Sequence, residues 1–266
     1  MGELFPADLT GVGLLVLLVA AFGAGWVVAV VGGGGLIQLP ALLLFGGVTP
    51  LQALGTNKLA SVFGTLTSAA TYFRRARPAV RTALPMAAGA FVLSVAGASV
   101  AARLPAEVIT PVIVVALVVV AGVTAARPSL GELARARRAA GRHYLLAMLL
   151  ALVIGFYDGV LGPGTGTFLV IGLIALLGYD FLHASATTKI VNAATNLGAL
   201  AFFLPAGAVL VGLGVAMGAA NVAGSYLGSR MAIARGNRFI RVVFLVVACA
   251  LILRLGSDVV RDLVDG

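Results

Sequence analysis

Two lysines within apolar stretches are the strongest candidates for chemistry in this sequence. Lys58 and Lys189 are the only lysines among the 266 residues, and the segments around them carry almost no other charge. A buried cation is costly unless it meets a counter-charge. We therefore interpret the pair as positive charge offered to a small anion. The alternative, open at this stage, is that each ammonium group reaches the membrane interface along its aliphatic stem.

Hydroxyl and amide side chains accompany both lysines, most of them at a spacing of four residues. The first group is Thr56, Asn57, Ser61 and Thr65, and the second is Thr187, Thr188, Asn192 and Asn196. On a helix, residues four apart share one face, so each group forms a polar stripe. Such a stripe is costly against lipid and is expected to face protein or a water-filled path. Hydrogen bonding between neighbouring helices is the other explanation.

Two glycine-rich stretches each precede a short apolar run. GGGG spans 32–35 and GPGTG spans 162–166, and the candidate binding positions in them are Gly33, Gly34, Gly35, Gly162, Gly164, Thr165 and Gly166. The unpaired N–H groups at a helix start favour anions, and glycine lets a ligand approach the backbone. Neither stretch is a nucleotide-binding motif, because no Gly-Lys-Ser/Thr follows GPGTG and no βαβ unit surrounds GGGG. Tight helix packing is the alternative role for these glycines.

Asp158, in the sequence GFYDG, is the carboxylate just before the second glycine stretch. Three roles are open for it: it exchanges protons, it pairs with a lysine, or it caps the next segment. The two histidines and the single cysteine, Cys249, are too scattered to form a metal site. No credible nucleophile–base pair is present, so we expect no metal, no cofactor and no enzymatic activity.

The composition places these residues in a membrane. Hydrophobic residues make up 61% of the chain and charged residues 10%, with a mean hydropathy of +1.12. Soluble domains are about 45–50% apolar and about 25% charged, and a soluble fold of this length has too little interior to hide so much apolar surface. This excludes a soluble enzyme, a disordered chain and a nucleic-acid-binding domain. The lipid bilayer is the expected surrounding, and no nucleic-acid partner is expected.

Ten apolar runs are long enough, or nearly long enough, to cross the bilayer. They are 10–31, 36–47, 55–73, 82–102, 107–126, 144–161, 164–178, 186–204, 208–229 and 239–255. Continuous runs without two-residue alternation favour helices over a strand barrel. The runs at 36–47 and 164–178 are too short to cross alone and are predicted to be broken or re-entrant helices. The predicted fold class is an all-α polytopic membrane protein of about ten transmembrane segments.

Thirteen of the sixteen arginines gather in three stretches, at 74–81, 127–142 and 230–241. Arginine-rich loops of membrane proteins face the cytoplasm. Placing all three on that side gives five crossings before residue 127 and five after residue 143, with both termini outside. The predicted organisation is 1–126 as a first transmembrane repeat, 127–143 as a basic cytoplasmic linker and 144–266 as a second repeat. The net charge of +9 then reflects topology rather than a polyanionic partner.

The two halves align when the chain is shifted by 131 residues. Lys58 then meets Lys189, and Thr56, Gly33 and Gly35 also meet identical residues. The charges between segments exchange as well: the basic 74–81 corresponds to the nearly neutral 204–207, and the nearly neutral 103–107 to the basic 230–241. Two five-helix repeats inserted in opposite orientations require this exchange. Inverted repeats are typical of transporters, whose site lies at the membrane midplane between the halves.

The motifs resemble those of the TauE/SafE sulfite exporter family. GGGGLIQLPALLLFGGVTPLQALGTNKLAS, followed by an arginine cluster, is similar to its first repeat, and GFYDGVLGPGTGTFLVIGLIALLGYDFLHASATTKIVNAATNLGAL is similar to its second. The resemblance covers about residues 11–255 and implies a bacterial-type inner-membrane transporter of small sulfur-containing anions that uses the proton-motive force. The family pattern carries over onto Gly33, Gly35, Pro40, Thr56, Asn57, Lys58, Asp158, Gly162, Pro163, Gly164, Gly166, Lys189, Asn192 and Asn196.

We expect a multi-pass secondary transporter of the sulfite, thiosulfate or organosulfonate class. The anion is expected to bind at the midplane between the helix starts and the two lysines, and rocking of one repeat against the other alternates access. Asp158 is the candidate proton carrier. An anion channel and a non-transporting membrane assembly factor are the alternatives. The sequence leaves open the individual sulfur anion, the direction of transport and whether the chain forms a homo-oligomer.

Overall fold

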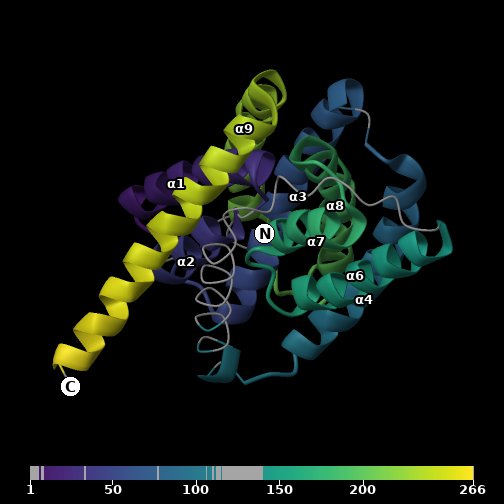
Figure 1. Cartoon of the computed structure of the whole chain (residues 1–266). Helices are drawn as coiled ribbons and strands as arrows, with labels where there is room; N and C mark the ends of the chain where they lie inside the picture. Colours follow the sequence, from purple (N-terminus) through teal and green to yellow (C-terminus); the bar gives the residue numbers. More distant parts are fainter. Residues whose placement is uncertain are drawn as a thin grey trace.

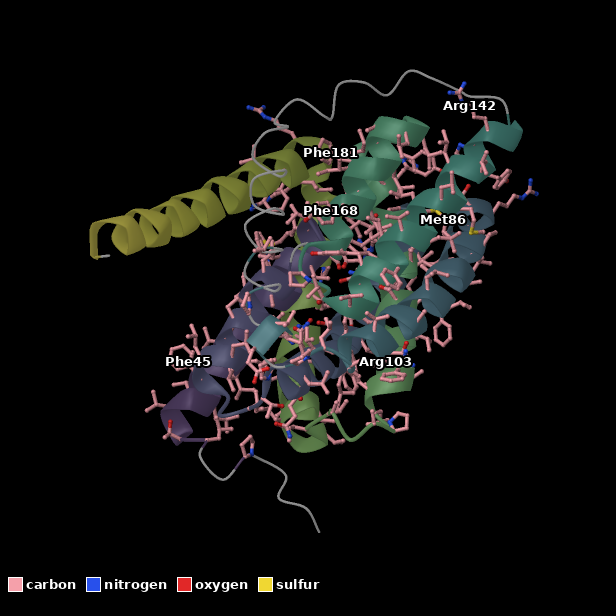
Figure 2. The ribbon with its side chains drawn as sticks, turned by 90° about the horizontal axis from the view of Figure 1, so that it is seen from below. Phe45, Met86, Arg103, Arg142, Phe168 and Phe181 are labelled. Atoms are coloured by element: carbon pink, nitrogen blue, oxygen red, sulfur yellow. The ribbon has the colours of Figure 1, made fainter. Side chains whose placement is uncertain are left out.

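The computed structural model describes residues 6, 9–32, 34–76, 78–105, 107–109, 111, 115 and 140–265, and within the last range it places the side chains of 142–236, 238–240 and 242. The helices are α1 (Gly11–Val30), α2 (Gly35–Phe45), α3 (Pro50–Ala76), α4 (Val80–Ala101), α6 (Ala140–Val160), α7 (Thr165–Leu177), α8 (Phe181–Phe203) and α9 (Val211–Asp265). No strand occurs in this part of the chain, which confirms the all-helical prediction. The last part of α9 projects away from the other helices (Figures 1 and 2).

Seven of the predicted segments correspond to separate helices, and the segments 208–229 and 239–255 both lie largely within α9, but the basic stretches differ from the prediction. Helix α3 continues to Ala76, so Arg74 and Arg75 lie on its last turn rather than in a loop. The stretch 230–241 is also helical, apart from Gly236, whose φ of 66° lies outside the helical region. Arginine is itself a good helix former, so a cluster of charges need not end a helix. Most of the predicted segment 107–126, and residues 127–139 of the predicted linker 127–143, lie outside the described residues.

Four of the described helices are long and apolar enough to cross a membrane. They are Gly11–Val31, Val80–Ala101, Arg142–Val160 and Val211–Gly236. The helices α2 and α7 have 11 and 13 residues, or about 17 and 20 Å at a rise of 1.5 Å per residue. The apolar core of a bilayer is about 30 Å thick, so neither short helix crosses it alone. The polar stripes lower the hydropathy of the long helices α3 and α8.

Local sequence explains where several helices begin and end. The side chain of Thr10 accepts a hydrogen bond from the backbone N–H of Gly13 at 3.0 Å, which caps the start of α1. Asp180 accepts in the same way from the N–H of His183 at 2.9 Å and caps α8. Helix α7 ends at Gly178, whose φ of 74° is a left-handed conformation that glycine adopts without strain.

The helices of the two halves interleave. Helix α1 packs along α9 and α6 packs along α4, while α3 lies against α8 and α9 and α8 lies against α3 and α4. Figure 1 shows α4 and α6 side by side. When α1–α4 are matched in order with α6–α9, every one of these contacts has a counterpart with the halves exchanged. The short helices follow the same rule, because α2 contacts α1 and α3 and α7 contacts α6 and α8.

Two buried apolar clusters surround the short helices and leave a polar layer between them. One cluster joins Leu42 of α2 to Leu54 of α3. The other joins Leu173 of α7 to Tyr72 of α3. Along α3, the polar residues from 56 to 68 lie between these two contacts. The fold therefore positions its polar side chains midway along the long helices, where the two short helices begin.

Glycines let the long helices approach each other closely. A Cβ atom at Gly224 of α9 would lie 2.0 Å from the carbonyl oxygen of Phe22 in α1, and one at Gly97 of α4 would lie 2.2 Å from that of Phe156 in α6. Real Cβ atoms do not approach so closely, so the backbones occupy the space of the absent side chains. The equivalent α1–α9 and α4–α6 contacts therefore both depend on glycines that allow close approach of the backbones.

We predict that Gly224→Ala destabilises the protein. The added methyl group would push α9 away from Phe22, and overpacking of this kind costs roughly 1–3 kcal/mol of the free energy of unfolding. Gly23→Ala in α1 is the matched control, because nothing lies within 4 Å of a Cβ at that position. Denaturant unfolding of both purified variants in detergent measures the difference. Equal stabilities would contradict the close approach of α1 and α9.

Candidate functional site

The two glycine stretches meet at the centre of the molecule. A Cβ atom at Gly32 would lie 2.4 Å from the carbonyl carbon of Gly166, and one at Gly166 would lie 2.4 Å from the carbonyl oxygen of Gly32. Gly32 and Gly162 share a φ of 93°, which only glycine adopts readily. Helix α2 begins at Gly35 and α7 at Thr165. The N-termini of both short helices therefore start beside this crossing.

Lys58 is buried beside the crossing and forms an ion pair. Its Nζ atom lies 2.8 Å from Oδ2 of Asp158 and donates a hydrogen bond to the backbone carbonyl of the same residue at 2.5 Å. The other carboxylate oxygen of Asp158 accepts from the hydroxyl of Thr165 at 2.5 Å. Of the roles open for Asp158, pairing with a lysine is therefore present. Asp158 also contacts the first residue of α7, through a side chain rather than a backbone N–H group.

Lys189 has a different environment. Its ammonium group is fully buried, donates to the backbone carbonyl of Val28 and lies 5.9 Å from the ring centroid of Tyr72. Within the described part of the chain, no carboxylate forms an ion pair with it. Because both ammonium groups are bound inside the structure, the alternative that they extend along lipid to the membrane interface is wrong.

The two lysines occupy equivalent positions but have unequal partners. Each binds a carbonyl in the last turn of the first helix of the other half: Lys58 at Asp158 in α6, and Lys189 at Val28 in α1. The carbonyls at a helix C-terminus carry the negative end of the helix dipole, which stabilises a cation. The lysines lie 131 residues apart and their acceptors 130 residues apart. The residue whose carbonyl accepts from the lysine is therefore an aspartate in the second half, Asp158, and a valine in the first half, Val28.

A cavity of about 20 Å³ lies against the Lys58–Asp158 pair, enough for about one water molecule. It is lined by Val28, Gly32, Gly35, Asn57, Lys58, Ser61, Thr65, Asp158, Gly162, Thr165, Asn192 and Asn196. The polar stripes of α3 and α8 thus face one shared space. Buried Oδ1 of Asn57 has no hydrogen-bond partner among the described residues. An unsatisfied buried oxygen of this kind calls for a ligand, a water molecule or a movement.

The structure does not bring every candidate to this cavity. Gly34, Gly164, Gly166, Thr56, Thr188 and Lys189 are described but do not line it, and Gly33 lies outside the described residues. The hydroxyl of Thr56 is already used, because it accepts from the backbone N–H of Leu210 at 3.0 Å. The hydroxyl of Thr188 is buried without a partner among the described residues.

A buried hydrogen-bond network of amide side chains contacts the backbone carbonyl of Asn57. Gln38 of α2 donates to the backbone carbonyl of Asn57 at 3.4 Å and accepts from the side chain of Asn221 at 2.8 Å. Ser225 then donates to Asn221 at 3.3 Å. Sequence reasoning did not select these residues. The signal for Gln38 was its position as the one polar side chain in the short apolar helix α2.

Nothing in the described ranges resembles a metal centre. No group of three histidine, cysteine, aspartate or glutamate side chains comes close enough there to hold an ion. The groups that line the cavity are the Lys58 ammonium group with its partner Asp158, and amide and hydroxyl side chains, beside the starts of two helices. The ammonium group, the N–H and O–H donors and the positive ends of the helix dipoles suit a small anion.

Comparison with known proteins places this geometry in a family. The profile described as "Sulfite exporter TauE/SafE" matches residues 17–255. The chain belongs to the TauE/SafE family. It is 39% identical to the "Probable membrane transporter protein ORF9" of Sinorhizobium sp over 245 residues, which are 92% of this chain and 93% of that protein. No solved structure matches the chain.

Two further relatives cover similar lengths. The Escherichia coli K12 protein named "Probable membrane transporter protein YfcA" is 31% identical over 91% of this chain and 89% of its own. A Haemophilus influenzae protein named "Probable membrane transporter protein" is 32% identical over 92% of this chain and 95% of its own. The TauE/SafE relatives are named as membrane transporters and not as enzymes, and the apolar helices agree with a multi-pass membrane protein.

We predict that the two lysines contribute differently to stability. Lys58→Met leaves Asp158 as an unpaired buried charge and should lower the free energy of unfolding by about 3–5 kcal/mol. Lys189→Met, the matched control, strands no carboxylate and should cost much less. Adding Asp158→Val to Lys58→Met should recover most of the loss. Denaturant unfolding in detergent measures all three variants, and similar losses for both single variants would contradict the unequal pairing.

Proposed function

We propose that this TauE/SafE protein is a secondary transporter of a small sulfur-containing anion of the sulfite, thiosulfate or organosulfonate class. One observation carries the proposal: of the two buried lysines beside the starts of two half-length helices, only Lys58 has a carboxylate partner among the described residues. Protonated Lys189 therefore leaves the centre with an excess of positive charge in a medium where charge is costly. This excess attracts an anion, and the family's name supports sulfur oxyanions as the class.

The proposed architecture is two inverted repeats, 1–126 and 144–266, joined by the linker 127–143. The exchanged helix contacts support it, because α1 with α9 repeats as α6 with α4, and α3 with α9 repeats as α8 with α4. The crossed bonds of the two lysines support it independently. Each half then contributes the same elements to one central site, and about ten segments cross the membrane in total.

The proposed location is the inner membrane of a bacterial cell, with both termini outside. Arg74, Arg75 and Arg230 all line one pocket, so the basic end of α3 lies beside Arg230, in the interior of α9. Figure 2 shows Arg142 at one end of the bundle and Arg103, which belongs to no arginine cluster, toward the other. Clustered arginines at one end are what positive-inside sorting predicts for the cytoplasmic side.

The proposed binding site is the cavity beside Lys58, with the polar stripes of α3 and α8 as its walls. Its donors are the Lys58 ammonium group, the amides of Asn57, Asn192 and Asn196, and the hydroxyl of Ser61. The space of about 20 Å³ is too small for a sulfur oxyanion. The structure therefore corresponds to a closed state, and substrate enters when the halves move apart at the glycine crossing. Alternation of such movements toward each side gives alternating access.

The Lys58–Asp158 pair provides a simple link to protons. While Asp158 is ionised, its carboxylate neutralises the Lys58 ammonium group, which the anion needs as its own counter-charge. A proton on Asp158 releases Lys58, and the anion takes the place of the carboxylate as its counter-charge. Binding of one anion is then linked to binding of one proton, and the net charge of the site stays the same for a singly charged anion such as an organosulfonate. Loss of the proton restores the ion pair and expels the anion.

We predict that thiosulfate, sulfite or an organosulfonate stabilises the purified protein in a thermal-shift screen, with sulfate as a comparison anion. Lys58→Ala should weaken binding of the best anion by about 10- to 100-fold, the value of a lost charge-assisted hydrogen bond of about 1.5–3 kcal/mol. Lys189→Ala tests the second buried charge, and Arg103→Ala is the control for a charge removed far from the cavity.

A double variant that should still fold keeps this test decisive. Lys58→Ala/Asp158→Asn removes both members of the ion pair, so no buried charge is left unpaired. If both lysine variants and this double variant fold and bind the anion as tightly as the unaltered protein, the site proposal is wrong. If no sulfur anion changes the melting temperature at all, a non-transporting assembly factor becomes the better reading.

We predict that anion affinity rises as the pH falls, by up to tenfold per pH unit for one linked proton. Asp158→Asn cannot ionise and should bind with an affinity that is independent of pH and at least as high. Calorimetric titration with thiosulfate or a sulfonate between pH 5.5 and 8 measures both proteins, because these anions stay ionised throughout. The same pH dependence in Asp158→Asn would exclude Asp158 as the proton carrier.

Liposome flux separates the carrier from the channel. A thiosulfate gradient should drive proton movement with the unaltered protein and not with Asp158→Asn. Voltage-driven anion flux that is far faster than a carrier cycle and moves no protons would instead identify an anion channel built on the same glycines.

A further inference from the structure

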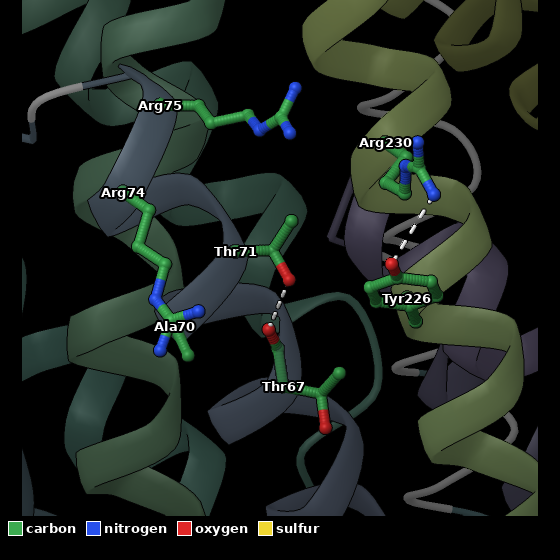
Figure 3. Close-up of a pocket in the computed structure, with 7 residues that line it drawn as sticks. All are labelled: Thr67, Ala70, Thr71, Arg74, Arg75, Tyr226 and Arg230. Atoms are coloured by element: carbon green, nitrogen blue, oxygen red, sulfur yellow. Dashed lines mark hydrogen bonds between the residues drawn. The ribbon is translucent and has the colours of Figure 1, made fainter.

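A second positively charged site lies at the end of α3, away from the central cavity. A pocket of about 380 Å³ opens between α3 and α9 (Figure 3), and it is lined by Thr67, Ala70, Thr71, Arg74, Arg75, Tyr226 and Arg230. Arg75 follows Lys58 by 17 residues on the same helix, or about 25 Å at 1.5 Å per residue. The pocket shares no lining residue with the central cavity, although its Thr67 follows Thr65 of that cavity by two residues. Its volume falls in the range of about 300–1,000 Å³ of small-molecule sites.

Three guanidinium groups line this pocket, and none of its lining residues is acidic. Among the described residues, the ion pairs join Lys58 to Asp158 and His183 to Asp180, so no described carboxylate neutralises these arginines. Figure 3 shows Arg75 extending from α3 toward α9, with Arg230 on the facing wall. The pocket is thus a concentration of positive charge without an acidic partner in the part of the chain that the structure describes.

Tyr226 holds one of the guanidinium groups against the wall. Nη1 of Arg230 donates to Oη of Tyr226 at 3.3 Å, and Cζ of Arg230 lies 5.5 Å from the ring centroid. This bond uses a lone pair of the tyrosine oxygen, so its own hydroxyl proton remains a donor. The hydroxyls of Thr67 and Thr71 donate to the backbone carbonyls of Phe63 and Thr67, each at 2.8 Å. The donors left for a ligand are thus guanidinium groups and one phenol.

The chemistry of these donors points to phosphate. A guanidinium group presents two parallel N–H donors that match two oxygens of one phosphate. Several such groups around one pocket make an oxyanion site in which arginine supplies both charge and geometry. The positive-inside rule requires only that arginines lie on the cytoplasmic side. It does not require arginines from two helices to line one pocket.

The surface beside the pocket is apolar and exposed. Phe73 precedes Arg74, Leu227 follows Tyr226, and Leu66 lies one turn below Ala70, and these three side chains are 56%, 47% and 45% exposed. In a multi-pass membrane protein, exposed apolar side chains face acyl chains. A ligand that fits both surfaces has a charged phosphate and hydrocarbon chains. We propose that this pocket binds the headgroup phosphate of an anionic phospholipid.

The test compares lipid retention by variants of equal charge. Arg75→Gln/Arg230→Gln removes two guanidinium groups from the pocket, and Arg81→Gln/Arg103→Gln removes two from elsewhere on the described surface. Native mass spectrometry of the full chain, in detergent with phosphatidylglycerol or phosphatidylcholine, counts the lipids retained. A basic residue near a headgroup contributes about fivefold to binding. The pocket variant should therefore lose phosphatidylglycerol about 25-fold, and the control variant less than twofold.

Three results would overturn the assignment, and each is distinct from the transport proposal. Equal loss in the pocket and control variants would indicate general attraction to charge. Equal retention of phosphatidylcholine and phosphatidylglycerol by the unaltered protein would remove the need for an anionic lipid. Competition by 1 mM inorganic phosphate as strong as that by phosphatidylglycerol would identify a site for a soluble oxyanion. Anion binding at the central cavity should be the same in both variants, so failure of one proposal leaves the other standing.

Discussion

The burial of two ammonium groups is the constraint on which the rest of the structure depends. A cation inside a membrane protein needs oxygen partners, because neither lipid nor apolar side chains replace its water. Both lysines find them at carbonyls in the C-terminal turns of α1 and α6, where the helix dipole is negative. To reach them, each lysine crosses into the other half. The interleaving of the helices therefore follows from the solvation of two charges.

Helix ends of opposite dipole charge meet at this same centre. The C-termini of α1 and α6 receive the lysines, while the N-termini of α2 and α7 start a few residues later, beyond the glycines. Side chains at Gly32 and Gly166 would block this arrangement, because each backbone lies where the other's Cβ would stand. Glycine is therefore required at both positions for steric reasons. The helices α2 and α7 are short because four helix ends meet at this one point.

The sequence predicted the parts of this centre better than their pairing. The rarity of lysine, the four-residue polar stripes and the two glycine stretches identified most of the cavity lining from spacing alone. Spacing could not show that Lys189 binds Val28, because an apolar residue that contributes only its carbonyl leaves no trace in the sequence. Nor could it show that the hydroxyl of Thr56 accepts a hydrogen bond from the backbone N–H of Leu210, just before α9, because that contact depends on how distant helices pack. The arginines were expected in loops and lie partly on helices, since helix propensity gives no sharp stop at a charged residue.

The valine at position 28 has a consequence for energetics. In the proposed alternating-access cycle, two halves of identical sequence would give states open to either side that are related by a two-fold rotation and equal in free energy. A carboxylate at 158 opposite a valine at 28 removes that equality at the buried charged centre. In the proposed cycle, the two facing states then differ in how well one lysine is neutralised. A single side chain would thus set which way the empty protein rests.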